Sequence, residues 1–246
     1  MPSYNAENTI KESICSVIAQ TFLDWELIVV DDGSLDSTVP IVMDMAEHEP
    51  RICLYTLPAN QGVAVARNFG LEKAVGQWIA FLDSDDVWHK EKLERQLCFA
   101  DETNATITYT ATSYMDAAGK RYGYVLPATR VLTYKALMRG NIMSCSSVMV
   151  RRDVMVPFTG KPRTHEDYVM WLQLVKKEGC AFGLNEPLLT YRMAEGSKSA
   201  NRLDSVIMTF NAYSQVGYGI VMSVLFTLRY ALHSISKRRC IRGNTR

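Results

Sequence analysis

The feature that most restricts the fold of this sequence is a short apolar run that ends in a cluster of acids. The run covers residues 78–82, and Asp83, Ser84, Asp85 and Asp86 follow it directly. An apolar run of this length, rich in aromatic and branched residues, is typical of a buried strand in a parallel sheet. Open α/β sheets bind ligands beyond the carboxyl ends of their strands, so we expect these acids to border a crevice.

The spacing of the acids indicates a metal site. Three carboxylates within four positions repel one another unless a cation joins them. Hard divalent cations such as Mg²⁺ take oxygen ligands, commonly one or two carboxylates together with substrate phosphates. We expect Asp85 to be the direct ligand, with Asp83 as a supporting ligand or a contact to a ribose. The alternative is a solvated acidic turn that caps the next helix.

The first half of the chain alternates strand and helix patterns. Strand-type runs cover 27–30, 51–56, 78–82 and 106–114, and helical periodicity covers 7–19, 39–47, 63–75 and 90–99. This order predicts an α/β fold, an open and mostly parallel twisted sheet with helices on both faces, of the kind that binds nucleotides. The sequence contains neither GxGxxG nor GxxxxGKS, so a metal would have to neutralise the phosphates.

Two further residues of this half are candidates for contacts to a ligand. Asp32 lies in Asp31-Asp32-Gly33-Ser34, which is typical of a strand-to-helix turn and leaves Asp32 free to accept a hydrogen bond. Arg67 lies one turn into the helix expected at 63–75. Its guanidinium suits a diphosphate, and the alternative is a surface salt bridge.

Composition excludes several other classes of protein. Lysine and arginine number 27 against 26 aspartates and glutamates, so no overall charge favours nucleic acid as a partner. The six cysteines form no CxxC pair and fit no zinc motif, which is typical of core cysteines in a reducing compartment. Residues 1–20 mix polar and apolar side chains and do not read as a signal peptide.

Several motifs in order resemble family 2 of the inverting glycosyltransferases, which have the GT-A fold. They are Pro2-Ser3-Tyr4-Asn5, segments 19–22 and 25–34, Asn60-Gln61-Gly62 with Ala66-Arg67-Asn68, and Asp83-Ser84-Asp85-Asp86. The resemblance covers roughly residues 1–200. It implies transfer of a sugar from a nucleotide-diphosphate sugar, expected to be a UDP-sugar, with Mn²⁺ or Mg²⁺ on the acids. It also implies a role in cell-surface polysaccharide, lipopolysaccharide or capsule synthesis.

The same resemblance implies that the first residues of the chain contact the nucleotide-sugar donor. Pro2 and Tyr4 are expected at the carboxyl end of the first strand, with Tyr4 stacking on the nucleotide base. Only Met1 precedes Pro2, so almost none of the family's first strand is present. We therefore expect Met1 to be an internal methionine of a longer reading frame.

A second acidic pair, Glu166-Asp167, precedes a helix expected at 168–177. Acids are favoured at a helix start by the helix dipole, and this alone could explain the pair. In the family, a Glu-Asp pair before a Trp-Leu helix recurs, and Trp171-Leu172 matches it; the resemblance assigns Asp167 as general base. An acceptor hydroxyl must lose its proton as it attacks the anomeric carbon. His165 is a less favoured base.

The remaining positions bear on organisation and specificity. We expect a GT-A domain at 1–200, divided into a nucleotide-sugar half (1–115) and an acceptor half (116–200), and a C-terminal amphipathic helix and basic tail at 201–246.

Many relatives carry a histidine two residues after the arginine of the closing loop, where this chain has Ala194; Arg192 or Lys198 is a candidate to compensate. Ser197 and Ser199 also resemble that loop.

The C-terminal segment 203–235 predicts a helix with an apolar stripe. The stripe comprises Ile220, Val221, Val224, Leu225, Leu228, Leu232 and Ile235, and four basic residues follow it, Lys237, Arg238, Arg239 and Arg242. Residues 216–232 are too few and too polar for a membrane span. The helix either packs on the catalytic domain or lies on an anionic membrane surface. The second interpretation places the protein in the cytoplasm, at the inner face of the membrane, with a glycan or glycolipid acceptor.

Two other classes of function remain open. A nucleotidyltransferase that makes nucleotide sugars shares this kind of fold, but it typically carries a glycine-rich basic signature near its start, which Pro2 to Asn5 does not provide. A non-catalytic module that binds nucleotide sugars would not need both Asp85 and Asp167. Hydrolysis of the donor separates the three classes.

Overall fold

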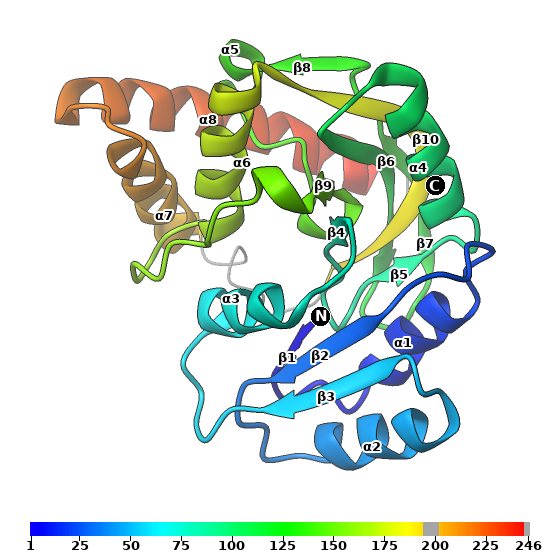
Figure 1. Ribbon diagram of the computed structural model, residues 1–246. Coiled ribbons are helices and arrows are strands. Elements are labelled where there is room, and N and C mark those ends of the chain that lie inside the picture. Colours follow the sequence, from blue (N-terminus) through cyan, green and yellow to red (C-terminus); the bar gives the residue numbers. More distant parts are fainter. Residues whose placement is uncertain (194–201, 244–246) are drawn as a thin grey trace.

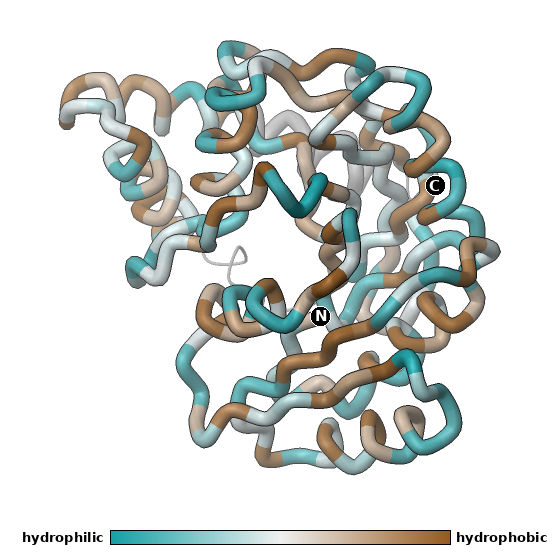
Figure 2. Tube along the Cα trace, in the orientation of Figure 1, coloured by the Kyte–Doolittle hydropathy of each residue, from teal (hydrophilic) through white to brown (hydrophobic). Residues whose placement is uncertain are grey.

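The structure is a computed structural model and describes residues 1–193 and 202–243 (Figure 1). Its N-terminal part is a parallel sheet in the order β1-β2-β3, formed by Pro2–Ser3, Leu27–Asp31 and Ile52–Thr56. The helices of this part are α1 (Ile10–Ile18), α2 (Thr38–His48) and α3 (Val63–Lys73). In Figure 2 most of β2 has the brown colour of hydrophobic residues, and its side chains are almost all buried. The carboxyl ends of β1 and β2 therefore meet at one edge.

The short β1 is paired with β2 through the first residues of the chain. The Met1 amino group donates to the Ile28 carbonyl at 2.7 Å, and the Val30 amide donates to the Met1 carbonyl. An upstream extension of this strand stays a prediction.

The second sheet is mixed. Its strand order is β4-β9-β6-β10-β5, with β7 added to β6 and β8 added to β10. The strands are β4 (Trp78–Ala80), β5 (Val87–Trp88), β6 (Ile107–Asp116), β7 (Arg121–Leu126), β8 (Val131–Thr133), β9 (Met149–Arg151) and β10 (Cys180–Met193). Among these pairs only β6 and β10 run parallel. The predicted α/β fold with helices over the sheets is confirmed. The expectation of a mostly parallel sheet holds for β1-β2-β3 and is wrong for this second sheet, in which most neighbouring strands run antiparallel.

The apolar run 78–82 differs from its prediction in one respect. It forms β4 and then two buried residues, Phe81 and Leu82, but β4 pairs with β9 in the antiparallel direction. The expectation of a parallel strand here is wrong. Buried strands of either direction carry the same apolar pattern, and the direction is decided by the partner β9, which lies about seventy residues later in the chain.

The remaining helical elements lie in the second half, apart from α4 (Lys92–Thr103), which follows β5. They are α5 (Tyr134–Leu137), α6 (Glu166–Glu178), α7 (Arg202–Gln215), α8 (Ile220–Gly243) and the 3₁₀ turns η1 (Cys145–Ser147) and η2 (Arg152–Val154). Helix α6 is the centre of the larger hydrophobic core. Its Trp171 is fully buried and meets Phe81 edge-on at 5.6 Å between ring centroids.

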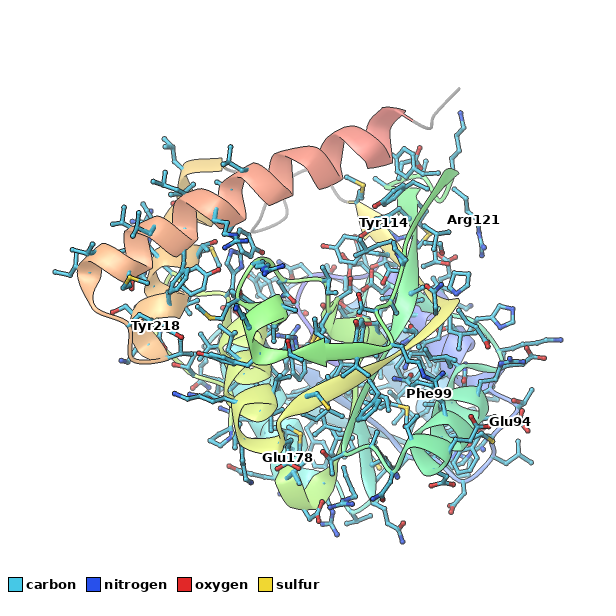
Figure 3. The ribbon with its side chains drawn as sticks, turned by 90° about the horizontal axis from the view of Figure 1, so that it is seen from above. Glu94, Phe99, Tyr114, Arg121, Glu178 and Tyr218 are labelled. Carbon is cyan, nitrogen blue, oxygen red and sulfur yellow. The ribbon has the colours of Figure 1, made fainter. Side chains whose placement is uncertain are left out.

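The C-terminal segment forms two helices instead of the single helix expected at 203–235. The break lies at Gly217, whose φ of 99° is readily adopted only by glycine. In Figure 3 Tyr218 marks this turn, beyond which α8 crosses the molecule. Tyr213 of α7 is fully buried, and its ring lies 5.9 Å from that of Tyr168 in α6. The helices α7 and α8 thus pack on the helix that begins with Glu166-Asp167.

None of the described helices, α8 included, combines the length and apolar character needed to cross a bilayer.

Candidate active site

The acidic turn after β4 is joined to the start of α6 by one buried arginine. Arg67, from α3, donates from Nη2 to Asp83 Oδ1 at 2.6 Å and from Nη1 to Glu166 Oε1 at 3.0 Å. Its side chain is only 6% exposed, and it lies beside the Phe158 ring. Arg67 therefore brings together two acidic motifs that lie 83 positions apart (Asp83 to Glu166) in the sequence.

This contact corrects one of the two expectations for Arg67. The residue forms a buried ion pair, so it is not a surface salt bridge. Two of its guanidinium nitrogens contact carboxylates, and a contact to the donor diphosphate stays a prediction. The sequence could not show this, because the partner Glu166 comes from the other half of the chain.

Asp85 is the carboxylate of the acidic turn with the fewest contacts. Its main-chain carbonyl accepts a hydrogen bond from Arg192 Nε at 2.9 Å, but no side chain in the described part of the protein donates to its carboxylate. Burial, and then repulsion by Asp83, raise the pKa of Asp85 to about 6. A carboxylate in this environment gains most from a cation.

Asp86 has a structural environment. It is 1% exposed, and it accepts hydrogen bonds from the Ser146 hydroxyl at 2.6 Å and the Arg192 amide at 3.0 Å. Burial, followed by repulsion from Asp85 and Asp83, raises its pKa well above the ordinary range. Asp86 therefore holds other elements to the turn.

The sequence predicted a free carboxylate at Asp32, but the structure shows that this carboxylate is occupied. Its two carboxylate oxygens accept from the amides of Gln61 at 2.8 Å and Gly62 at 2.7 Å, and it is 3% exposed. Asp32 thus fixes the loop that leads into α3. A contact between Asp32 and the donor stays a prediction.

Pro2 and Tyr4 lie at the expected edge of the first sheet. Pro2 belongs to β1, and Tyr4 follows it with 46% of its surface exposed. The ring of Tyr4 is therefore accessible at the carboxyl end of β1, and its stacking on a base stays a prediction.

Asp167 lies in the first turn of α6, next to the Arg67-bound Glu166. Asn141 Nδ2 donates to its Oδ2 across a long 3.5 Å. Burial, and then repulsion by Glu166, raise the pKa of Asp167. A carboxylate with a raised pKa and a weak hydrogen bond is a better proton acceptor than an ordinary surface aspartate.

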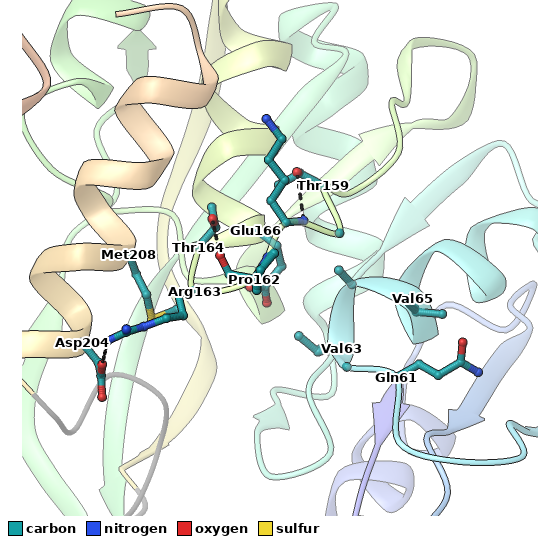
Figure 4. Close-up of a pocket in the computed structure, with 14 residues that line it drawn as sticks. Gln61, Val63, Val65, Thr159, Pro162, Arg163, Thr164, Glu166, Asp204 and Met208 are labelled. Carbon is teal, nitrogen blue, oxygen red and sulfur yellow. Dashed lines mark hydrogen bonds and ion pairs between the residues drawn. The ribbon is translucent and has the colours of Figure 1, made fainter. Parts of the chain in front are cut away.

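A cavity of about 460 Å³ opens beside Glu166 (Figure 4). It is lined by residues 61–65 at the start of α3, by the loop 159–164 and by Asp204 and Met208 of α7. Helix α7 also holds this loop. Arg163 pairs with Asp204, and Gln215 Nε2 donates to Thr164 Oγ1 at 2.7 Å. Helix α7 therefore shapes one wall of the cavity beside Glu166.

No sequence motif predicted two of the residues near the acids, Ser146 and Asn141. Ser146 and Asn141 sit in a stretch with no recognisable motif. The guanidinium of Arg192 contacts Glu12 and the carbonyls of Asp85 and Ala117, so it has little left to compensate for a missing histidine. Ala194, Ser197, Lys198 and Ser199 lie outside the described residues.

The fold and the arrangement of acids define a nucleotide-sugar transferase of the GT-A type. The sequence model described as Glycosyl transferase family 2 matches residues 1–155, and the chain belongs to that family. The protein is therefore a glycosyltransferase.

The full-length relatives are also glycosyltransferases. Over 242 residues the chain is 36% identical to the putative teichuronic acid biosynthesis glycosyltransferase TuaG of Bacillus subtilis, covering 96% of this chain and 95% of that protein. It is 33% identical to the UDP-Glc:alpha-D-GlcNAc-diphosphoundecaprenol beta-1,3-glucosyltransferase WfgD of Escherichia coli, covering 96% and 92%. The chain thus matches these relatives over nearly their whole length.

Two solved structures share the fold at low sequence identity. The S. aureus TarS fragment 1–349 in complex with UDP has a TM-score of 0.71 at 19% identity, covering 97% of this chain and 71% of that one. The mannosyltransferase PcManGT of Pyrobaculum calidifontis, in complex with GDP-Man and Mn²⁺, has a TM-score of 0.69 at 15% identity, covering 96% and 73%. The GT-A fold is confirmed.

Proposed function

We propose that the protein transfers a sugar from a UDP-sugar to a hydroxyl of a lipid-linked glycan, with inversion at the anomeric carbon. The observation that carries the proposal is the Arg67 bridge, which places the acids after β4 beside Glu166-Asp167. A donor held by the first group thereby lies next to a base in the second. WfgD, named for a UDP-Glc donor and a diphosphoundecaprenol acceptor, supports this choice of substrates.

In the proposed reaction Asp167 takes the proton of the acceptor hydroxyl as that oxygen attacks the anomeric carbon. Its raised pKa brings it nearer to the working pH, which is what a general base needs. One displacement inverts the centre, so no carboxylate nucleophile is required on the opposite face. The cavity beside Glu166 is the proposed place of the acceptor.

A divalent metal, Mn²⁺ or Mg²⁺, fits the residues after β4 in part. Asp85 offers a carboxylate without a side-chain donor among the described residues, whereas one oxygen of Asp83 is held by Arg67. The described residues contain no ready group of three acidic, histidine or cysteine ligands. Asp85, supported by Asp83, would therefore share the ion with donor phosphates and water, and the ion would neutralise the diphosphate.

Calorimetry tests the metal proposal. Asp85→Asn should abolish the part of the UDP affinity that depends on Mn²⁺, while Asp116→Asn, an acid outside the site, should leave it in place. Unchanged metal-dependent affinity in Asp85→Asn would reject Asp85 as the ligand.

Peripheral contact with an anionic membrane is supported by the surface of α8. Its outer face exposes seven large apolar residues, Ile220, Val221, Met222, Val224, Leu225, Leu228 and Leu232. An exposed apolar patch of this kind commonly marks an interaction site, and the sequence continues into four basic residues. The location that follows is the cytoplasmic face of the membrane, where a lipid-linked acceptor would be met.

Sedimentation with anionic liposomes tests this contact on the full chain. Leu225→Glu and Leu228→Glu change exposed side chains, so the fold should persist while sedimentation falls. Val75→Glu, at an equally exposed valine away from α8, is the matched control. Equal sedimentation of all variants would leave α8 as a helix that only packs on the domain.

The reaction itself is tested with a panel of nucleotide sugars and a polyprenyl-diphosphate sugar acceptor. The expected product is a glycan extended by one sugar, with the opposite anomeric configuration to the donor by NMR. Without acceptor, slow release of free sugar and nucleoside diphosphate is expected. A requirement for a nucleoside triphosphate with release of pyrophosphate would favour a nucleotidyltransferase, and binding without turnover would favour a binding module.

A further inference from the structure

Ser146 occupies an unusual place behind the acidic turn. It lies in η1, is fully buried, and comes from a segment some sixty residues beyond the turn. Its hydroxyl oxygen accepts the Asp83 amide at 3.0 Å, and its proton is donated to Asp86 Oδ2 at 2.6 Å. One hydroxyl therefore connects the first and the last residue of Asp83-Ser84-Asp85-Asp86.

Two further hydrogen bonds fix the positions of Ser146 and Asp86. Trp88 Nε1 donates to the Ser146 carbonyl at 2.8 Å, and the other Asp86 oxygen accepts the Arg192 amide. The Ser146 hydroxyl, the Ser146 carbonyl and both carboxylate oxygens of Asp86 thus each have a partner, and buried polar groups that are satisfied in this way make a rigid arrangement. The one acid of the turn that takes no part is Asp85, which lies between the two anchored residues.

We propose that Ser146 is a positioning residue of the donor site, which sets where Asp85 presents its carboxylate. The inference rests on the proposed function, because it concerns the metal and nucleotide held there. Ser146 touches neither. It acts by fixing both ends of the turn, so that the Asp85 carboxylate is placed before the ligand arrives.

The neighbouring serine provides a matched control. Ser147 lies in the same 3₁₀ turn and is also fully buried, but its hydroxyl donates to the Ser144 carbonyl at 2.7 Å and does not reach the acidic turn. Replacement of either serine by alanine removes one buried hydroxyl. Only the change at 146 removes the link between Asp83 and Asp86.

The test compares Ser146→Ala, Ser147→Ala and wild type by calorimetry with UDP, with and without Mn²⁺, below their measured melting temperatures. Ser146→Ala should weaken Mn²⁺-dependent UDP binding by about 10-fold or more, with little change in metal-free binding, because loss of a buried hydrogen bond typically shifts an equilibrium by about this factor. Ser147→Ala should stay within about 2-fold of wild type. Ser146→Cys, which keeps a weak donor, should lie between.

The opposite results separate the inference from the function on which it rests. Equal weakening in the two alanine variants would overturn the positioning role, as would loss of metal-free binding alone. A wild type that binds UDP without any effect of Mn²⁺ would reject the metal proposal itself, and the inference with it. If Ser146→Ala does not fold, Trp88→Phe removes the hydrogen bond to the Ser146 carbonyl, together with part of a buried indole, and leaves the Ser146 hydroxyl in place. It should show a smaller loss of the same metal-dependent kind; no loss there overturns the proposal.

Discussion

Two acidic motifs that follow strands in this protein look alike in sequence and differ in structure. After β2, Asp31 accepts from Ser3 Oγ, Ser34 Oγ and the Ser34 amide, and Asp32 accepts from two amides of the loop before α3. After β4, Asp83 and Asp86 are held in a similar way, but Asp85 has no side-chain donor among the described residues.

The difference teaches how to separate structural from functional carboxylates. An acid whose oxygens are all met by donors of its own chain is stabilised as part of the fold. An acid that is partly buried and poorly matched keeps its capacity for a cation or a proton. Burial raises the pKa of Asp85 and also that of the fully hydrogen-bonded Asp86, so the missing donor separates the two acids and the direction of the pKa does not. The two acids at the start of α6 differ in the same way. Glu166 is held by Arg67 at 3.0 Å, whereas the side-chain donor to Asp167, Asn141, is a long 3.5 Å away.

The largest expected effect sharpens this division at the start of α6. Asp167→Asn should lower kcat by about 10² to 10⁴-fold, the contribution typical of a general base, with donor affinity unchanged. Steady-state kinetics and calorimetry measure the two quantities. Glu166→Gln, which removes a partner of Arg67, should mainly lower thermal stability. A near-normal kcat in Asp167→Asn would show that another group takes the proton.

The next effect concerns the arginine between the two acidic motifs. Arg67→Gln should lower the free energy of unfolding by about 3–5 kcal/mol, because it leaves two partly buried carboxylates without their cation. Arg95→Gln breaks an exposed pair with Glu186 and should cost no more than about 1 kcal/mol. Denaturant titration compares the two; similar losses would mean that the Arg67 bridge contributes no more than a surface pair.

The pH dependence of stability tests the raised pKa of Asp85. Its folded pKa of about 6 exceeds the ordinary 3.8, so the metal-free protein loses stability as pH rises through this window, and the loss is nearly complete by about pH 7. Asp85→Asn removes the charge, and at pH 8 with chelator it should be more stable than wild type by at most about 3 kcal/mol. The gain should shrink towards pH 4. A gain that is equal at both pH values would point to packing instead.

The smallest effect returns to the motif after β2. Asp32→Asn keeps one acceptor but replaces the other with a donor, so one loop amide loses its partner. We expect a loss of about 1–3 kcal/mol in the free energy of unfolding and a raised KM for the donor, with Mn²⁺ dependence retained. If Asp32→Asn abolished the Mn²⁺ dependence, the contrast between the two motifs would fail.

Much of the fold followed from local patterns. The alternation of strand and helix, the position of most elements and the acids at strand ends were all predicted, because periodicity and turn residues report on nearby chain. The direction of β4 was not, because it depends on pairing with β9. The joint at Gly217 was missed because the apolar spacing continued past it.

The site was predicted less completely, for a related reason. The acids were found, but their partners were not. Asp32 is met by amides about thirty residues away, Arg67 by a carboxylate about a hundred residues away, and Asp86 by a serine in an apolar stretch without a motif. Which carboxylate is satisfied depends on such distant contacts, and no single stretch of sequence contains that information.

The turn η1 also provides a chemical reporter. Cys145 precedes Ser146 in it, is buried, and has a thiol pKa raised well above the ordinary value, chiefly by that burial. Thiolate is the reactive form, so Cys145 should react with alkylating reagents only when this turn opens. Cys15, Cys53 and Cys98 are exposed and supply fast internal references. The alkylation rate of Cys145 thus measures how often the structure opens behind the acidic turn, and no cysteine has to be introduced for the measurement.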